Sequence, residues 1–525
     1  MTVLEPQASD TRRPNVIEPS ATDPVVRSAS QLIGGPVGRH AKRPPRRGFW
    51  IPLRVVLLSA IVMAGLAWLQ KYPCSDGGWE DYQQYTQYCY SDIRALWGAE
   101  RLDEGAVPYW DHPVEYPVLT GYFMGLLGLP SHWLLGAAGG TLYFHLSAVV
   151  LSIMGVLTVA GLAKLRPGRT WDAMMLAAAP AILFTAMVNW DWMPVMLTVF
   201  FMLAFAKGRT VVAGILWGLA IAAKFYPLLI AGPLLLLALR YRHLRPALVS
   251  VATAAGTWLA VNLPPMIRAT DGWLRFFQLN SERAIDWGTS WYILRHFTEP
   301  EHRLNQILND IPLVNMLYLV AFVAACAAIA WLTLMAPTPP RLAQVAFLVV
   351  AAFLLTGKVW SQQYVMWLIP LAVLARPQWR LFLVWQAGEL AYFFGFYSQL
   401  LTVSTTQDDS APAWGLVVPE WVFIVASLAR FITLGILVAA VVRDVRNPAG
   451  DVVRSTYGTD PDIGPLPLAP AAAMPQRALK LEHHCRSGVE HGDRRVLGRG
   501  VQHVLPRSPR DAVAHHHDRL DTGFA

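Results

Sequence analysis

The sequence is poor in charged residues and in cysteine, and both shortages narrow the class of protein that it can encode. Asp, Glu, Lys and Arg make up 15% of its 525 residues, against about 25% in an average soluble domain. Its four cysteines include no CxxC pair, so zinc-ribbon and thioredoxin-type motifs are excluded. The sequence contains no P-loop, GxGxxG, HExxH or GxSxG motif, which removes common nucleotide-binding, metalloprotease and hydrolase signatures.

Continuous apolar runs are what the sequence has in abundance. Hydrophobic residues make up 54% of the chain, and its mean hydropathy is +0.36. Only helices or closed barrels satisfy their backbone in lipid, and continuous rather than alternating runs indicate helices. The sequence therefore predicts an all-α, polytopic membrane helix bundle of about twelve spans, each needing about 20 apolar residues. The predicted spans are Ile51–Gln70 and the runs near 141–163, 172–189, 193–206, 211–223, 226–239, 247–264, 311–335, 343–357, 362–375, 381–398 and 418–442.

The basic residues predict the orientation of this bundle. The net charge is +8 and the pI about 9.3, and the positive-inside rule explains this excess without a nucleic-acid partner. With an inner amino terminus and alternating spans, the loops on the inner side are Lys164–Arg169, Lys207–Arg209, Arg240–Arg245, Arg376–Arg380 and Arg443–Arg446. This orientation requires the apolar segment Tyr116–Leu129 to re-enter the membrane or to lie at its interface, because one more span would move every later loop to the opposite side.

Composition divides the chain into three regions. Residues 1–48 are rich in Pro, Arg, Ser and Thr, which predicts a disordered cytoplasmic segment. Residues 49–445 are predicted to form the transmembrane bundle, and its first span is expected to be an uncleaved anchor. Residues 446–525 are Pro- and Ala-rich, then Arg- and His-rich, and predict a disordered cytoplasmic tail. Its His515–His517 run is more typical of a solvated tail than of a metal site.

A polar, aromatic loop, residues 71–117, is predicted on the outer side. Ser91 is suited to cap a short helix that runs to about Leu102 along the membrane surface. Cys74 and Cys89 share this loop, and their spacing fits a disulfide and two free thiols equally well.

Polar side chains also gather at the outer ends of the predicted spans. Polar groups within a membrane bundle are costly, so they are candidates for function. Carboxylates can act as general bases, cations can neutralise a phosphate leaving group, and aromatic rings can stack on sugars. The pattern indicates group transfer from a phosphate. The residues at the span ends are Asn189, Asp191, Lys224, Tyr226, Lys358, Gln363 and Tyr364.

Each candidate also has a structural explanation. Asp92 would sit in the first turn of a helix, where the helix dipole favours an acid. Lys224 and Lys358 can extend to the membrane interface, and Asp191 can cap the helix that follows it. Glu389 lies mid-way along a predicted span, where it either hydrogen-bonds between helices or marks a transport path.

Three segments of the outer loop carry a family resemblance. Tyr90-Ser-Asp-Ile-Arg-Ala-Leu-Trp, Leu102-Asp-Glu-Gly-Ala-Val-Pro-Tyr and Glu115-Tyr-Pro-Val-Leu-Thr-Gly-Tyr resemble the first external loop of glycosyltransferase family 87. These are bacterial α-mannosyltransferases of the GT-C superfamily that use polyprenyl-phosphate-mannose. Further similar segments are Gly214-Ile-Leu-Trp-Gly-Leu-Ala-Ile-Ala-Ala-Lys-Phe-Tyr-Pro and Ser361-Gln-Gln-Tyr-Val-Met-Trp-Leu-Ile-Pro-Leu, the latter with Ser-Gln-Gln-Tyr where many relatives have Ser-Pro-Gln-Tyr.

The resemblance covers roughly residues 51–445 and implies a GT-C bundle in the cell membrane with its active site on the external face. It implies an inverting mechanism with no metal or cofactor, in which Asp92 is the general base. Lys224 and Lys358 would hold the phosphate, and Asp111 and Glu115 are second candidates for the base or for acceptor contact. The implied partners are a polyprenyl-phosphate-sugar donor, a lipid or glycan acceptor and membrane lipids, with no nucleic acid. The remaining expected substrate-binding residues are Arg94, Tyr116, Asn189, Asp191, Tyr226, Gln363 and Tyr364.

Two other functions fit a polytopic bundle. A transporter or lipid flippase predicts charges near mid-membrane and often inverted repeats, and the sequence offers Glu389 and no internal repeat. A non-catalytic membrane scaffold for envelope enzymes is compatible with every feature above.

Overall fold

Helices build the part of the chain that the structure describes. The computed structural model describes residues 17–18, 23–34, 50–407, 417–458 and 460–466, and no β-strand occurs among them. Five helical segments of these residues are long and apolar enough to cross a membrane, and five further apolar helices are shorter. The prediction of an all-α, polytopic membrane bundle is confirmed. The His515–His517 run lies outside the described residues.

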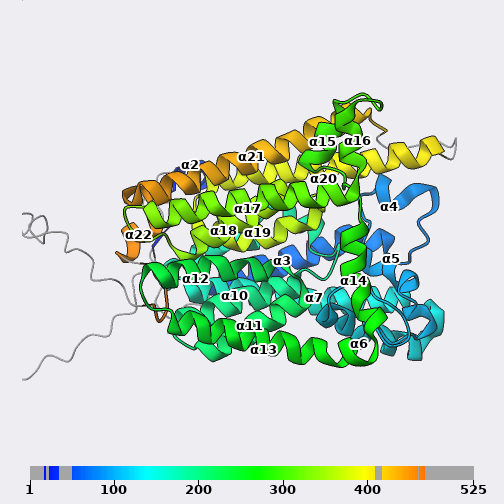
Figure 1. The fold of residues 1–525 in the computed structure, drawn as a ribbon, viewed down its shortest axis with the longest axis horizontal. Helices are drawn as coiled ribbons and strands as arrows, with labels where there is room; N and C mark the ends of the chain where they lie inside the picture. Colours follow the sequence, from blue (N-terminus) through cyan, green and yellow to red (C-terminus); the bar gives the residue numbers. More distant parts are fainter. Residues whose placement is uncertain (1–16, 19–22, 35–49, 408–416, 459, 467–525) are drawn as a thin grey trace, which may run out of the picture. The chain divides into compact units, whose positions relative to one another are not determined.

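Successive long helices run back and forth between two ends of the bundle (Figure 1). The short helix α19 need not match the full thickness of a bilayer, because other helices rather than lipid surround it: every one of its residues is buried. The helices of the bundle are α3 (Pro52–Lys71), α7 (Gly140–Leu165), α8 (Met174–Ala177) with α9 (Pro180–Thr185), α10 (Trp192–Ala206), α11 (Thr210–Ala223), α12 (Ala231–Arg240), α13 (Arg245–Arg268), α17 (Ile311–Met335), α18 (Leu342–Thr356), α19 (Val365–Ala375), α20 (Trp379–Gln407) and α21 (Glu420–Arg446).

Short elements cover each end of this bundle. One end, called here the loop end, carries the helices of the two long loops, and the opposite tail end carries the helices near the chain termini (Figure 1). The loop-end helices are α4 (Gln83–Thr86), α5 (Asp92–Ala99), α6 (Val118–Leu135), α14 (Thr270–Glu282), α15 (Ser290–His296) and α16 (Arg303–Asn309), and those of the tail end are α2 (Pro24–Gly34) and α22 (Val452–Tyr457).

Helix α6 stays at the loop end although its sequence is apolar. Near its start, the Thr120 hydroxyl donates to the carbonyl oxygen of Ala223, the last residue of α11, at 2.7 Å. Further along, Gly128 lies against Leu102, and the turn that follows brings Gly139 against Trp97 of α5. Both ends of α6 therefore lie on one side of the bundle, as the alternation of basic loops requires.

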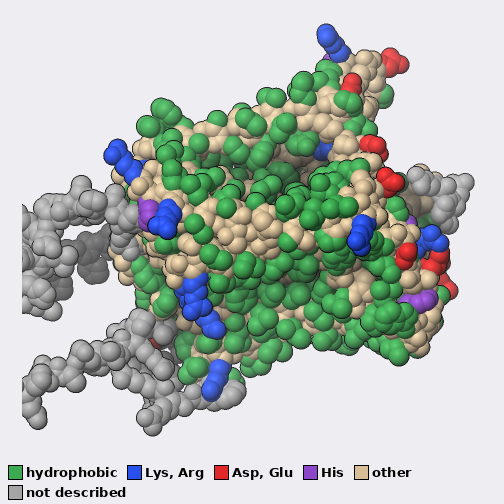
Figure 2. All heavy atoms as spheres, turned by 60° about the horizontal axis from the view of Figure 1, so that its bottom comes forward, with side chains coloured by type: hydrophobic (Ala, Val, Ile, Leu, Met, Phe, Trp, Pro, Cys, Tyr) green, Lys and Arg blue, Asp and Glu red, His purple; other side chains and the backbone are tan. Residues whose placement is uncertain are grey.

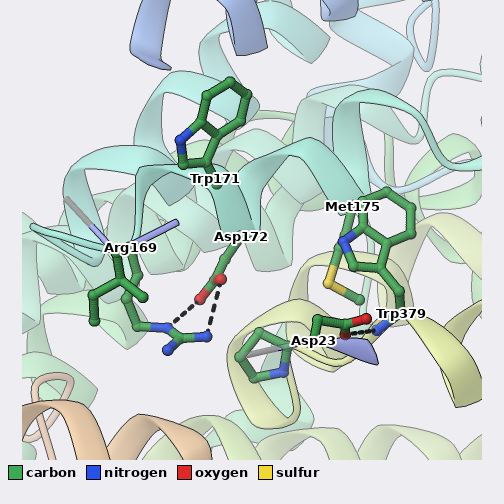
Figure 3. A pocket seen from close by; sticks show the side chains of 8 residues that line it. Asp23, Arg169, Trp171, Asp172, Met175 and Trp379 are labelled. Carbon is green, nitrogen blue, oxygen red and sulfur yellow. Dashed lines mark hydrogen bonds and ion pairs between the residues drawn. The ribbon is translucent and has the colours of Figure 1, made fainter. Parts of the chain in front are cut away.

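The segments expected to be disordered are partly helical where the structure describes them. Residues 24–34, within the predicted segment 1–48, form α2, and Asp23 ahead of this helix accepts a hydrogen bond from the backbone N–H of Trp379 at 2.9 Å. Figure 3 shows this contact in a tail-end pocket beside the Arg169–Asp172 ion pair. The pocket has a volume of only about 10 Å³, so it has no room for a substrate.

Buried ion pairs hold the beginning of the other terminal segment, 446–525. Arg341 Nε lies 2.7 Å from Asp451 Oδ2, and Arg166 Nη2 lies 2.6 Å from Asp462 Oδ2. Both guanidinium groups also donate to the carbonyl oxygen of Leu374, at the end of α19. Composition alone predicted disorder here because the partners that order these aspartates lie more than 100 residues away in the chain.

The surface matches a membrane protein. Hydrophobic side chains spread over the middle of the face in Figure 2, whereas Lys, Arg, Asp and Glu side chains gather towards its ends. The exposed apolar residues of α17, such as Leu319, Val323 and Trp331, are of the kind that faces lipid.

Candidate active site

A cavity of about 680 Å³ lies at the loop end of the bundle. Residues from six separate stretches of chain line it: the first external loop, the segment before α10, the η6 region (Tyr226–Ile230), the end of α14 with the residues after it, the region from the end of α18 through η7 (Gln362–Tyr364), and the part of α20 around Tyr397. Aromatic side chains make up much of the wall, with a few charged groups between them, as expected for a ligand pocket. Eight expected site residues line it: Asp92, Glu115, Tyr116, Asn189, Lys224, Tyr226, Gln363 and Tyr364.

Asp92 is the first residue of α5, and its position depends on the segment before α10. Its backbone N–H donates to the carbonyl oxygen of Val188 at 2.8 Å. Ser91 occupies the N-cap position, but its hydroxyl donates to the Met187 carbonyl oxygen at 2.6 Å and makes no cap bond. Ser91 therefore occupies the predicted N-cap position, but the prediction that its side chain caps the helix is wrong. The serine instead fastens the start of α5 to a stretch almost 100 residues later.

The surroundings of the Asp92 carboxyl tune its basicity. Burial raises the pKa of Asp92, whereas hydrogen bonds from Asn189 and Tyr90 and the positive charge of Lys224 oppose that rise. Asn189 Nδ2 donates to Asp92 Oδ2 at 2.8 Å and also lies 2.7 Å from the Tyr116 hydroxyl. A carboxylate that is more basic than in water is suited to accept a proton, and the donors around it favour its charged form.

Lys224 points into the bundle rather than towards the membrane interface. Its ammonium lies 3.2 Å from Asp191 Oδ1, and its side chain is 14% exposed. Asp191 is fully buried and accepts a hydrogen bond from the Trp367 indole at 2.6 Å. It stands at the N-cap position of α10 but makes no cap bond through its side chain. Asp191 is thus the counter-ion behind Lys224 and does not itself line the cavity.

Stacked aromatic rings form the wall around Lys224. Tyr226 and Trp367 stack with ring centroids 4.6 Å apart, and Tyr364 stacks on Trp367 at 3.8 Å. The Lys224 ammonium lies 5.4 to 5.8 Å from the ring centroids of Tyr116, Tyr364 and Trp367. Next to them, the buried side-chain oxygen of Gln363 has no hydrogen-bond partner among the described residues, and it is available to a ligand.

The second long loop, which runs from α13 to α17, supplies cavity residues that sequence reasoning did not select, and two of them are charged. Arg283 and Asp286 follow α14 and form an ion pair of 3.5 Å. The Lys358 ammonium donates to the carbonyl oxygens of Ser281 and Arg283, and the Asp286 N–H donates to the Lys358 carbonyl oxygen at 2.8 Å. Lys358, expected to bind phosphate, is absent from the cavity wall and instead fastens the segment that carries Arg283.

Two other expected site residues also lie away from the cavity wall. Arg94 donates to the carbonyl oxygens of Ser75 and Asp76 and ties α5 to the preceding loop. Asp111 is exposed and accepts a hydrogen bond from the Val107 N–H at 2.9 Å within its own turn. Motif and charge type suggested these residues, but a sequence does not say where a side chain points.

Two features of the loop end and its supporting helices were left open by the sequence. Cys74 and Cys89 form a disulfide with their Cα atoms 5.6 Å apart. Glu389, considered as a marker of a transport path, forms a buried ion pair with Arg430 of α21 at 2.9 Å. It therefore joins α20 to α21, in agreement with the interhelical alternative. Among the described residues, no group of three or more His, Cys, Asp or Glu side chains is arranged to hold a metal ion.

Part of the chain matches the model of a known protein family. The model of glycosyltransferase family 87 matches residues 119–361. The matched stretch includes Asn189, Lys224 and Arg283, and it begins after Asp92, so the role of Asp92 rests on geometry. No curated protein matches the chain.

Proposed function

The chain belongs to glycosyltransferase family 87 and is a membrane glycosyltransferase, and we propose that it transfers a hexose from a polyprenyl-phosphate donor to a lipid or glycan acceptor. The observation that carries the proposal is the meeting of Asp92 and Lys224 in one aromatic-lined cavity of about 680 Å³. A carboxylate and a cation in the same cavity are what transfer from a phosphate needs. The resemblance implies mannose as the sugar and a GT-C-type bundle as the scaffold.

In this proposal, Asp92 acts as the general base. An acceptor hydroxyl gives its proton to the Asp92 carboxylate while its oxygen attacks the anomeric carbon of the donor sugar. The bond between this carbon and the phosphate oxygen breaks, and the phosphate leaves with the electron pair. Attack opposite the leaving group inverts the anomeric centre, so that a β-linked donor gives an α-linked product. Asn189 holds the carboxylate oriented through its 2.8 Å hydrogen bond.

Lys224 and Arg283 are the cations for the leaving phosphate. Cations placed where charge develops stabilise the transition state, and they do so most effectively in a water-poor site. Lys224 is already paired with Asp191, which holds its ammonium in place before substrate arrives. Arg283 lines the same cavity, and its side chain, 42% exposed and paired with Asp286, would supply a second positive charge to the phosphate.

Two observations support a location in the cell membrane with the cavity on the external face. The Cys74–Cys89 disulfide lies in the loop that carries Asp92, and disulfides persist mainly in oxidising surroundings outside the cytoplasm. Basic residues of the predicted inner loops, including Arg166 and Arg376, lie at the opposite tail end, where they pair with Asp462 and Asp444.

The proposal is tested by supplying purified protein in lipid nanodiscs with labelled donors. We expect transfer from a polyprenyl-phosphate hexose, fastest with mannose, and none from the corresponding nucleotide sugar. The product linkage, read by NMR, should be of the opposite anomeric configuration to the donor. Transfer from nucleotide sugars alone, or a retained configuration, would contradict the proposed donor or mechanism.

A further inference from the structure

A second pocket lies at the loop end, apart from the cavity that holds Asp92. Its volume is about 330 Å³, and no residue lines both. It lies where α15, α16 and the start of α21 meet, and these elements stand together at the loop end in Figure 1. The lining residues are Tyr292, Arg295, His296, Asn305, Asn309 and Glu420.

The pocket mixes hydrogen-bond donors with acceptors and carries charges of both signs. Amide groups both donate and accept, the Arg295 guanidinium only donates, and the Glu420 carboxylate only accepts. Glu420 would repel an anion such as a phosphate, and Arg295 would repel a cation. A neutral ligand with many hydroxyl groups, each of which donates and accepts, matches this set best. Carbohydrate is the ligand class with that character.

Contacts among the lining side chains hold them in place before any ligand binds. The Tyr292 hydroxyl donates to Glu420 Oε1 at 2.7 Å, and the Asn309 amide donates to Asn305 Oδ1 at 2.7 Å. The Arg295 guanidinium lies over the Tyr292 ring at 5.1 Å. A pocket whose side chains are already ordered loses less entropy when it binds.

A short, anchored stretch of chain connects this pocket with the catalytic cavity. Asp286 lines the cavity and Tyr292 lines the pocket, so six peptide links separate them and their Cα atoms lie at most about 20 Å apart. The Ser290 hydroxyl and the Trp291 indole donate to backbone carbonyl oxygens at the end of α18, those of Leu355 and Thr356. The pocket therefore stands at a fixed and short distance from the site of transfer.

We propose that this pocket binds the glycan part of the acceptor, several sugar units away from the hydroxyl that reacts. The inference rests on the proposed function, because it names a second contact for the acceptor of that reaction. An acceptor long enough to occupy both sites gains affinity from the pocket, whereas a short acceptor contacts only the catalytic cavity.

The test compares a long and a short acceptor in the double variant Asn305→Ala/Asn309→Ala, which removes both amides and leaves the Tyr292–Glu420 contact. The probes are an α-linked mannose disaccharide and an octasaccharide, each offered with labelled polyprenyl-phosphate-mannose. We expect KM for the octasaccharide to rise about tenfold, the effect of two lost hydrogen bonds. The kcat value and KM for the disaccharide should stay unchanged. Gln306→Ala, an exposed position on the same helix, is the matched control and should change neither acceptor.

The outcomes separate this inference from the proposed function. An unchanged KM for the octasaccharide in the double variant, with transfer intact, overturns the pocket and leaves the glycosyltransferase. If the wild type transfers to neither acceptor, the proposed reaction fails, and binding of the octasaccharide is then measured directly by calorimetry. Binding that Asn305→Ala/Asn309→Ala weakens and Gln306→Ala does not would support the pocket even then, and equal binding by all three proteins would overturn it.

Discussion

The ammonium of Lys224 lies 3.2 Å from the carboxylate of Asp191, which is fully buried and also accepts a hydrogen bond from the Trp367 indole. The pair joins the end of α11 to the start of α10, at the wall of the cavity that also holds Asp92. One member faces the cavity and the other does not. Stability should therefore depend on the charge balance between the two residues, whereas catalysis should depend on Lys224 itself.

We predict that Lys224→Met loses both stability and transfer. Removing the cation leaves Asp191 as a buried, unpaired charge, at a cost of about 3–5 kcal/mol, and removes charge stabilisation of the leaving phosphate, which lowers kcat about 100-fold or more. The double variant Lys224→Met/Asp191→Asn should regain most of the thermal stability without regaining transfer. A double variant that recovers transfer as well would show that Lys224 has only a structural role.

A second prediction concerns the buried pair of Arg430 and Glu389. Arg430 donates to Glu389 and to the carbonyl oxygens of Trp360 and Ser361, just before the cavity-lining residues around η7. We expect Arg430→Lys, which keeps the charge but loses the guanidinium fork, to raise KM for the donor because those residues shift. The side chains of Gln362, Gln363 and Tyr364 are the ones affected. A change confined to thermal stability would contradict this positioning role.

Substitution of Glu389 tests whether the protein is an enzyme or a transporter. Its partner in the structure is Arg430, with a further hydrogen bond from the Trp385 indole at 2.9 Å. Glu389→Gln keeps the hydrogen-bonding shape, so we expect it to retain most of the transfer activity while unfolding at a lower temperature. Loss of proton-coupled lipid movement in proteoliposomes, with transfer unaffected, would favour the transport function instead.

Glu100 predicts a pH dependence of stability. Burial raises the pKa of Glu100 from 4.5 to about 7, with the charge of Glu115 adding to the rise, whereas the Glu115 N–H and Arg275 oppose it; His112 also faces the carboxyl, at 3.5 Å. Between these two pH values the folded protein binds a proton that the unfolded chain releases. Stability should therefore fall as pH rises from about 4.5 to about 7.

The variant Glu100→Gln isolates this effect, because the amide cannot ionise and keeps an oxygen for the Glu115 N–H. Thermal unfolding in detergent, followed from pH 5 to pH 7, should show a shallower decline for the variant than for the wild type. Equal slopes for the two proteins would assign the pH dependence to other groups.

The disulfide gives a prediction about the loop that carries Asp92. Cys74 and Cys89 are 15 residues apart, and a closed loop of this size stabilises a protein by about 3 kcal/mol. Cys74→Ala/Cys89→Ala should lower the unfolding temperature and slow transfer, because the loop leading into α5 loosens. Cys326→Ala, which removes a free cysteine in α17, is the control and should behave as the wild type in both measurements.

The sequence was sufficient to predict the bundle, because the need to satisfy backbone hydrogen bonds in lipid applies to every membrane-spanning segment. Apolar runs must be helical in lipid, and the basic loops fix how the runs alternate. This reasoning also required Tyr116–Leu129 not to span, and the structure has α6 at the loop end. The terminal helices α2 and α22 were not predicted from the sequence. Groups that are distant in the chain order these segments, as Arg341 does through its ion pair with Asp451.

The site was less accessible to sequence reasoning than the fold. Motif and residue type selected Asp92, Asn189 and Lys224, which the structure brings together around one cavity. The same criteria selected Arg94 and Lys358, whose charges instead meet backbone carbonyl oxygens. Arg283 was missed because its place in the cavity depends on how the second long loop folds back. The signal that the sequence offers is the mixture of aromatic and charged residues between the predicted spans 247–264 and 311–335.

The central claim, that Asp92 is the base of a glycosyl transfer, is tested most directly by Asp92→Asn. Asparagine preserves the size of the side chain and removes its capacity to accept a proton, so kcat should fall by about 100- to 10,000-fold. Asp111→Asn, in the same loop but away from the cavity, should transfer at the wild-type rate. The measurement is transfer of labelled mannose from polyprenyl-phosphate-mannose by the three proteins, each first shown to unfold at a similar temperature. Loss of transfer in Asp92→Asn alone is the predicted result, and transfer by Asp92→Asn at the wild-type rate would contradict the account.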